Sequence, residues 1–234
     1  MDNEKNFETY LYFSDKKLSI SVQQKNRDFY LYKRSIILDE NQNNLQLGKL
    51  DEFLNSNIFK VEKLLKEFIK NVTLIIDHKE ILKITLSLKK KNYGKLIDKN
   101  SLNSLFKDAR NQIKENYNDK IITHMIINKY FIDGEYFLHF PENLRFENLC
   151  VDIDFICLSE DFIKKFELLL SRYQIKIQHI ISANYARNYF KDDEIDVFLM
   201  CKKIKQGHNK NEILFIPKKS RNRGFFEKFF NFFN

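Results

Sequence analysis

The sequence predicts a mixed α+β fold, and three observations support this prediction. Runs rich in apolar and aromatic residues at 7–13, 18–23 and 29–38 are separated by polar turn candidates, a pattern typical of an antiparallel meander. Apolar residues then recur at three- and four-residue spacing over 49–70, which predicts a helix with one buried face. Later segments alternate between strand-like and helix-like patterns without an internal repeat, and 234 residues of which 43% are hydrophobic suffice for one domain or two small ones.

The middle of the chain continues this alternation. The lysines at 89–91 together with Gly94 mark the start of a second unit, whose first helix is predicted over 100–117 with Ser101 as its N-cap. Strands are predicted at the apolar runs 72–76, 81–88, 121–132, 149–158 and 175–181.

Three elements complete the expected fold. Ser159 is the predicted N-cap of a helix that extends to Tyr173. Glu160 and Asp161 in its first turn interact favourably with the helix dipole. A short helix is expected at 183–189. A hairpin is expected to follow, formed by strands at 195–201 and 212–216.

Composition and charge exclude several classes of protein. Five glycines and two prolines are few, so glycine-rich nucleotide loops are not expected. The segment 202–234 carries nine basic and two acidic residues, a net +7 of the total +8, so the positive charge lies on a terminal appendage. A nucleic-acid-binding body would carry its charge on the folded part, and no nucleic-acid partner is expected.

The cysteines and histidines indicate neither a disulfide framework nor a metal site. Cys150, Cys157 and Cys201 are odd in number and include no C-x-x-C pair, which fits reduced thiols in a cytosol. The five histidines show no ligand spacing. The start of the chain does not resemble a signal peptide and no apolar run is long enough to span a bilayer, so we expect a protein that is neither secreted nor transmembrane.

One pair of carboxylates suggests an enzymatic alternative. Phosphate-loop, dinucleotide, zinc-protease and serine-hydrolase motifs are all absent. The stretch VDIDF places Asp152 and Asp154 on the same face of a strand, a pattern that resembles the metal-binding strand of nucleotidyltransferases, with Asp196 as a conceivable third carboxylate. That family's preceding Gly-Ser turn is missing, so the simpler hypothesis is a solvated strand face without metal or cofactor.

The C-terminal end predicts a membrane-binding helix. In FFEKFFNFFN the six phenylalanines fall within an arc of roughly 160° at a helical spacing of about 100° per residue. Basic residues precede this arc, the arrangement of an interfacial anchor beside anionic lipid. A single such helix binds weakly, so useful anchoring implies several copies. The predicted membrane-binding residues are Lys218, Lys219, Arg221, Arg223, Phe225, Phe226, Phe229, Phe230, Phe232 and Phe233.

The order of elements resembles the bacterial actin-like cell-division protein family FtsA. Four features carry the resemblance: the helix at 49–70 leading into NVTLIIDHKEILKITLSL, the stretch HMIINKYFIDGE, the segment VDIDFICLSEDFIKKFELLLSRYQIKIQHIISA, and the Phe-rich tail. The resemblance implies a partial actin-like (ribonuclease-H-like) first lobe at 1–89 and 183–217 and an inserted small α/β subdomain at 90–182. A basic linker and membrane-targeting helix at 218–234 complete it.

The chain departs from that family at both phosphate loops. The first loop is replaced by residues 13–17, Phe-Ser-Asp-Lys-Lys, the second by residues 202–206, and no second lobe follows. No ATP-binding residue is therefore carried over. The family's contact with the tubulin-like ring protein FtsZ involves the missing lobe, so the question of whether this chain binds FtsZ stays open.

These observations lead to one main functional hypothesis and two alternatives. The main hypothesis is a non-enzymatic, membrane-tethered adaptor of the division machinery, located at the cytoplasmic face of the inner membrane. It would bind division proteins, and copies of itself through the sheet edges of the inserted subdomain. The alternatives are a metal-dependent nucleotidyltransferase and an adaptor of another membrane assembly, as in the related PilM family.

Overall fold

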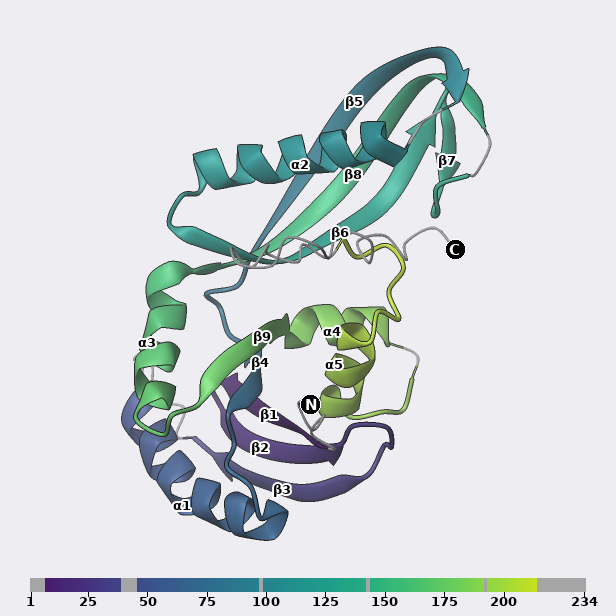
Figure 1. Ribbon diagram of the computed structural model, residues 1–234. Coiled ribbons are helices and arrows are strands. Elements are labelled where there is room, and N and C mark those ends of the chain that lie inside the picture. The colour runs from purple at the N-terminus through teal and green to yellow at the C-terminus, as the bar shows by residue number, and fades with distance from the viewer. Residues whose placement is uncertain (1–6, 39–45, 97–98, 142–143, 192, 214–234) are drawn as a thin grey trace, which may run out of the picture. The chain divides into compact units, whose positions relative to one another are not determined.

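The computed structural model describes residues 7–38, 46–96, 99–141, 144–191 and 193–213. These residues form two compact units (Figure 1). Unit 1 contains the described residues up to 82 together with 119–123 and 156–206. Unit 2 contains the described residues of 83–118, 124–155 and 207–213.

Unit 1 is built on a five-stranded sheet of order β3-β2-β1-β4-β9. The three N-terminal strands form the expected antiparallel meander, while β4 pairs in parallel with both β1 and β9. A meander followed by a helix and by parallel strands of the same sheet is the arrangement implied for an actin-like first lobe, so the predicted fold class is confirmed. The strands are β1 (Phe7–Ser14), β2 (Lys17–Gln24), β3 (Tyr30–Ile37), β4 (Asn71–Asp77) and β9 (Lys176–Ser182).

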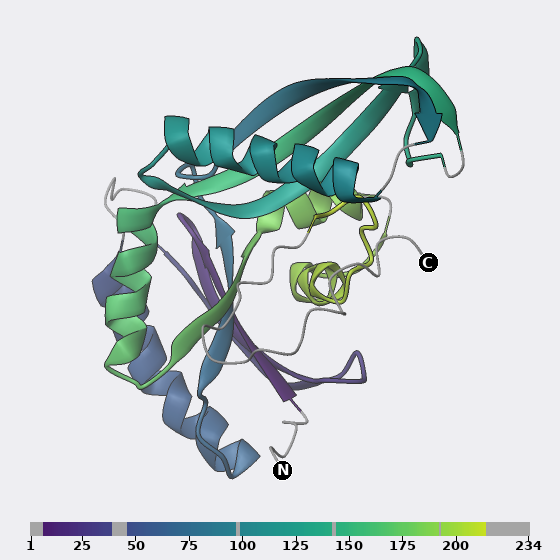
Figure 2. The same ribbon diagram turned by 45° about the horizontal axis from the view of Figure 1, so that its top comes forward.

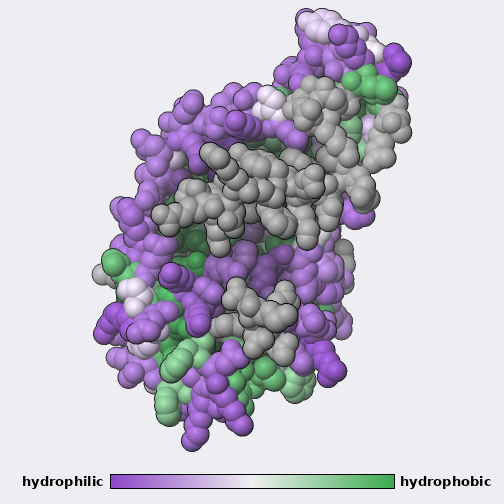
Figure 3. Space-filling view, viewed as in Figure 1, coloured by the Kyte–Doolittle hydropathy of each residue, from purple (hydrophilic) through white to green (hydrophobic). Residues whose placement is uncertain are grey.

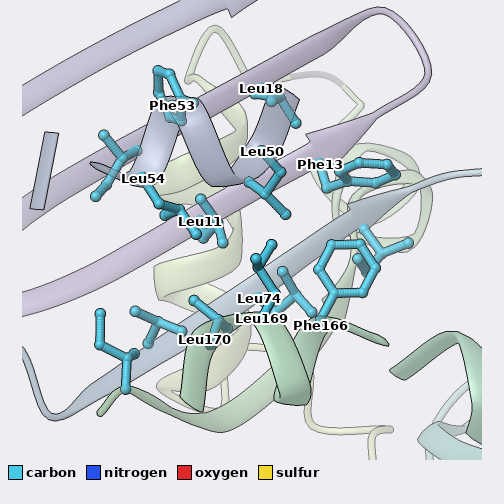
Figure 4. Close-up of a cluster of buried hydrophobic side chains, with 14 of the residues drawn as sticks. Leu11, Phe13, Leu18, Leu50, Phe53, Leu54, Leu74, Phe166, Leu169 and Leu170 are labelled. Atoms are coloured by element: carbon cyan, nitrogen blue, oxygen red, sulfur yellow. The ribbon is translucent and has the colours of Figure 1, made fainter. Parts of the chain in front are cut away.

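Two helices, α1 (Leu47–Leu65) and α3 (Glu160–Ser171), pack on one face of this sheet. Alternate residues of β1, Leu11 and Phe13, point into the core that these helices close (Figure 4). Five apolar residues of α1 recur at helical spacing and are buried in this core, as predicted: Leu50, Phe53, Leu54, Ile58 and Val61. Leu64, which was expected on the same face, is 53% exposed. The helix ends at Leu65 and not at residue 70, because Lys66 adopts a left-handed backbone conformation with φ of 54°.

The opposite face of the sheet carries two short helices, α4 (Ala183–Tyr189) and α5 (Val197–Lys205) (Figure 2). Tyr12, which alternates with the core residues of β1, meets Phe198 of α5 edge to face with ring centroids 6.3 Å apart. α4 has the predicted bounds. The predicted strand at 195–201 is wrong, since Asp196 instead caps the N-terminus of α5 and accepts hydrogen bonds from two of its backbone N–H groups.

Unit 2 is a four-stranded sheet of order β5-β8-β6-β7, with one face covered by α2 (Lys99–Asn116) (Figure 1). The predicted apolar face of α2 is buried at Leu102, Phe106, Ala109 and Ile113. The helix begins two residues before Ser101, which therefore lies in its first turn and is not its N-cap. The strands are β5 (Leu82–Leu96), β6 (Lys120–Ile132), β7 (Glu135–Phe137) and β8 (Arg145–Ser159).

Two features of the chain differ from the predicted organisation. The segment 90–182, expected to form one inserted subdomain, is divided between the units, because Phe166 of α3 and Ile177 of β9 pack into the core of unit 1. The predicted hairpin partner at 212–216 does not pair with 195–201. Instead, Glu212 forms an antiparallel bridge with Ile126 of β6, and Ile213 N–H donates to the carbonyl oxygen of Met125.

Among the residues that the structure describes, no helix is long and apolar enough to cross a membrane. The predicted basic linker and Phe-rich helix at 218–234, with all ten predicted membrane-binding residues, lie outside the described residues.

Candidate functional site

The edge of the unit 1 sheet where β1, β4 and β9 end is the candidate ligand-binding edge. These three strands are mutually parallel and end at Ser14, Asp77 and Ser182. In open sheets of this kind, ligands bind outside the carboxyl ends of the parallel strands. In an actin-like lobe this edge also carries the phosphate loop between β1 and β2. We call it the carboxyl edge.

The β1–β2 connection at the carboxyl edge is a tight turn stabilised by Ser14. The Ser14 hydroxyl accepts from Lys16 N–H at 3.4 Å and donates to the carbonyl oxygen of Lys17 at 3.2 Å. The carbonyl oxygen of Lys16 in turn accepts from Leu38 N–H at 2.8 Å. A phosphate cradle needs several backbone N–H groups that converge on open space. In this turn the Lys16 N–H already donates to Ser14, and there is no glycine that would let a phosphate approach the backbone closely.

His78 packs beside this turn and links it to β4. Its Nε2 lies 2.9 Å from Oδ1 of Asp15, and its Nδ1 accepts from Glu80 N–H at 3.1 Å. The ring lies between Phe13 and Phe162, with centroid distances of 5.9 and 5.1 Å, and only 8% of the side chain is exposed. A neutral imidazole that carries its proton on Nε2 satisfies both contacts. The side chain therefore fills the space next to the turn.

The end of β4 carries a second cluster of side chains that bind one another, in which 31% of the Asp77 and 43% of the Arg187 side chain is exposed. Arg187 of α4 donates through Nη1 to Oδ2 of Asp77 at 2.8 Å and through Nη2 to the Tyr12 hydroxyl at 3.1 Å. The Tyr12 hydroxyl donates to the same Asp77 oxygen at 2.6 Å. Burial and the Asp77 carboxylate raise the pKa of Tyr12, so the hydroxyl stays protonated. Burial lowers the pKa of Arg187, but Asp77 and Tyr12 raise it by more.

The carboxyl edge is therefore occupied by its own side chains. Asp77, His78 and Arg187 were not among the site residues predicted from the sequence. The available signal was an Asp-His pair directly after the apolar strand at 72–76. Arg187 lies 110 positions away from Asp77, and only the fold brings them together.

Asp196, the conceivable third carboxylate, has a structural role. Its Oδ1 accepts from the N–H groups of Phe198 and Leu199 at 3.0 and 3.1 Å, and its Oδ2 accepts from Tyr30 and, at 2.7 Å, from Lys33. Burial alone would raise the pKa of this carboxyl, but Lys33 and Tyr30 lower it overall. Asp196 thus anchors α5 to β3.

Asp152 and Asp154 lie on the same face of β8, as predicted, but neighbouring side chains neutralise them. Asp154 accepts from Thr85 at 2.6 Å and pairs with Lys83 at 2.7 Å, and only 6% of its side chain is exposed. Asp152 accepts from Ser87 at 2.5 Å and lies 3.2 Å from Nζ of Lys129. Two lysines beside two carboxylates disfavour a divalent cation, and no cluster of three or more potential ligands occurs in the described part of the chain.

Part of the basic segment that we expected to be an appendage belongs to the folded body. Lys202 is 2% exposed and donates to the carbonyl oxygens of Gln24 and Arg27 at 3.1 and 2.7 Å, so it fixes the β2–β3 turn. Lys205 pairs with Glu8 at 2.7 Å. The predicted replacement of the second phosphate loop, residues 202–206, is therefore the end of α5 and its C-cap.

Comparisons with known proteins show similarity to solved structures. No family model and no curated protein sequence matches the chain. The chain is similar to the structure of the PilM-PilN type IV pilus biogenesis complex, with 10% identity, a TM-score of 0.47 and coverage of 79% of this chain and 49% of that one. A second similar structure is the cytoplasmic domain of EpsL, an inner membrane component of the type II secretion system of Vibrio cholerae, with 9% identity, a TM-score of 0.37 and coverage of 77% and 57%.

A third similar structure is a Bacteroides thetaiotaomicron protein described as having an actin-like ATPase fold and unknown function. It shows 15% identity, a TM-score of 0.33 and coverage of 81% of this chain and 58% of that one. The chain thus spans between about half and three fifths of the proteins it matches.

Proposed function

We propose that this protein is a non-enzymatic adaptor that binds a membrane through its C-terminal segment and partner proteins through its folded units. The observation that carries the proposal is the closed carboxyl edge. The turn at Ser14 and the ring of His78 occupy the phosphate-loop position, and Asp77 is bound by Arg187 and Tyr12. A lobe whose ligand-binding edge is filled by its own side chains is suited to binding partner proteins at its surface.

Membrane attachment is the second part of the proposal, and its support is the amino-acid pattern of the C-terminal segment. The described chain ends at Ile213, which is hydrogen-bonded to the β6 strand of unit 2. The basic residues and phenylalanines of 218–234 follow within a few positions. A peripheral attachment at the cytoplasmic face of a membrane follows from this pattern.

Two assemblies are candidates for the one that the adaptor serves. The first is an assembly comparable to the type IV pilus biogenesis complex of PilM and PilN or to the type II secretion system of EpsL. The second is the division machinery suggested by the resemblance to FtsA. The two candidates differ in where the protein gathers in its native cell. A fluorescent fusion that concentrates at midcell favours division, whereas one found along the membrane or at the poles favours the other assembly.

The test of the non-enzymatic assignment is a titration with ATP and magnesium, followed by thermal unfolding. We expect the melting temperature to match that with magnesium alone. A ligand at a hundred times its dissociation constant adds about 2.7 kcal/mol to stability, which raises the melting temperature of a chain of this size by several degrees. A saturable rise of that size would contradict the proposal.

A further inference from the structure

Within the described part of the chain, β5 is an edge strand of the unit 2 sheet. It is 15 residues long and stands at one end of the order β5-β8-β6-β7, so β8 is its strand neighbour within the described residues (Figure 1). The contacts Thr85–Asp154 and Ser87–Asp152 show that β5 and β8 run antiparallel. The other edge of β5 presents backbone N–H and C=O groups to which a further strand can bind.

This edge strand is strongly basic. β5 contains five lysines, at 83, 89, 90, 91 and 95, and no acidic residue. Lys83 is paired with Asp154. Lys89, Lys91 and Lys95 are exposed and form no ion pair with another described residue. In Figure 3 most of the coloured surface of unit 2 is hydrophilic, with a few hydrophobic patches.

The exposed lysines Lys83, Lys89 and Lys91 lie on one face of β5. Residues 83, 85, 87, 89 and 91 are the exposed members of an alternating pattern, so they share one face of the sheet. At the far end the strand bends, because Tyr93 and Gly94 both have positive φ, 53° and 67°. The straight, charged part of the edge therefore ends near Lys91.

A second copy of the chain is a poor occupant of this edge. Antiparallel pairing of two β5 strands centred on Ser87 would place Lys83 of each copy opposite Lys91 of the other. Parallel pairing in register would stack every lysine on itself. Like charges directly opposite each other in a sheet destabilise the pair. The self-association expected from the sheet edges is thus opposed at this edge in these two registers.

We propose that the β5 edge binds an extended segment of a partner protein whose acidic side chains occupy alternate positions and face Lys89 and Lys91. The backbone of the segment adds a strand to the sheet, and the lysines select its charge. This inference rests on the proposed adaptor function and gives the partner a chemical class.

The experiment uses the full chain in lipid-free buffer and fluorescence anisotropy of labelled twelve-residue peptides. The main probe alternates glutamate with threonine, a residue that favours strands. We expect saturable binding that weakens with added salt. Methylating every second backbone nitrogen of the probe should abolish binding, because it removes the donors needed for strand pairing. An alternating lysine–threonine peptide should not bind.

Variants assign the binding to β5. Lys89→Glu with Lys91→Glu should weaken binding of the glutamate–threonine peptide about tenfold or more, as two contacts change sign. The matched control is Lys60→Glu with Lys107→Glu, which makes the same change in net charge at exposed positions of α1 and α2 and should leave the affinity unchanged. Circular dichroism and thermal unfolding verify that both double variants fold.

Several outcomes would overturn the inference. If the N-methylated peptide or an oligothymidine of equal charge bound as tightly as the main probe, the binding would be adhesion of any polyanion and not strand pairing. Equal loss in both double variants, or no binding at all, would exclude the β5 edge. A self-association that Lys89→Glu with Lys91→Glu abolishes would assign the edge to a second copy. ATP-dependent stabilisation would contradict the non-enzymatic assignment and leave the peptide result standing.

Discussion

Nη1 of Arg187 lies 2.8 Å from Oδ2 of Asp77, although 110 positions separate the two residues. Asp77 ends a central strand, and Arg187 lies in the last turn of the helix that follows the neighbouring strand. The pair therefore joins β4 to the α4 helix at the edge of the sheet where a ligand would be expected. Tyr12 completes the cluster from β1. The same contacts that close the site also connect three elements of unit 1.

The first prediction concerns the energy of this pair. Asp77→Asn should lower the free energy of unfolding by about 1–2 kcal/mol, because a partly buried guanidinium loses its carboxylate. In a double-mutant cycle with Arg187→Met, the two changes should be non-additive by about 0.5–1.5 kcal/mol. Urea unfolding measures all four proteins.

An exposed ion pair provides the control. Glu160 and Lys164 of α3 pair at 3.1 Å with about half of each side chain exposed. A cycle of Glu160→Gln and Lys164→Met should give a coupling below about 0.5 kcal/mol. Additive changes at Asp77 and Arg187 would show that their contact does not stabilise the edge.

The second prediction is a pH dependence at Asp196. Lys33 and Tyr30 lower the pKa of this carboxyl in the folded protein, so its contribution to stability is present above the pKa of the unfolded chain and is lost as the pH falls through the folded value. Asp196→Asn keeps a good N-cap but cannot ionise. It should cost about 1 kcal/mol at pH 7 and less at about pH 3.

Urea unfolding at both pH values checks this, with Asp193→Asn as the control for the loss of one negative charge at an exposed position. If the difference between wild type and Asp196→Asn is the same at pH 7 and pH 3, the ion pair with Lys33 does not contribute.

Local sequence signals predicted most elements but not their partners. The meander followed from apolar runs between turn signals, and α1 and α2 followed from apolar residues that repeat at helical spacing. α3 followed from its N-cap and the acidic residues of its first turn. α4 was also expected, with the bounds that the structure shows. α5 was mistaken for a strand since its apolar run is short and continuous, which periodicity alone does not resolve. Better signals were present: Asp196 directly before the run, and lysines in the last turn at 202, 203 and 205.

The assignment of α3 and β9 to unit 1 depends on contacts between distant parts of the chain. Phe166 packs against Phe13 with ring centroids 5.0 Å apart, yet 153 positions separate the two residues in the sequence. The closed carboxyl edge has the same origin. The absence of glycine at 13–17 indicated that no phosphate loop forms there, but the side chains that fill the space come from β4, α3 and α4.

The third prediction concerns the contact between residues 211–213 and the β6 strand of unit 2. Nδ1 of His124 lies 2.6 Å from Oε1 of Glu212, and both side chains are at most 5% exposed. Glu212→Ala removes this buried contact and should lower the free energy of unfolding by about 1–3 kcal/mol. Hydrogen exchange should become faster at the amides of Ile127 and Ile213, which bond across the same pairing. Lys210→Ala at an exposed neighbouring position is the control, and equal exchange in both variants would argue against the anchoring role.

The last prediction tests membrane binding, which depends on residues outside the described part of the chain. The full-length protein should sediment with vesicles that contain anionic lipid and much less with neutral vesicles, since Lys218, Lys219, Arg221 and Arg223 supply attraction and the phenylalanines supply insertion. Neutralising the four basic residues should weaken binding, and added salt should have the same effect.

Two double variants distinguish insertion of the Phe-rich segment into a membrane from packing of that segment on the folded units. Phe226→Glu with Phe229→Glu places two charges inside the apolar arc and should abolish vesicle binding while the melting temperature stays unchanged. Asn231→Glu with Asn234→Glu adds the same charge on the polar side of the arc and should retain most of the binding. Half-burying six phenylalanines contributes roughly 4–5 kcal/mol before the cost of ordering the helix, so losing the arc removes most of the attachment. If the phenylalanine changes lower the melting temperature and leave vesicle binding intact, the segment is a core element, and the membrane-tethered function fails.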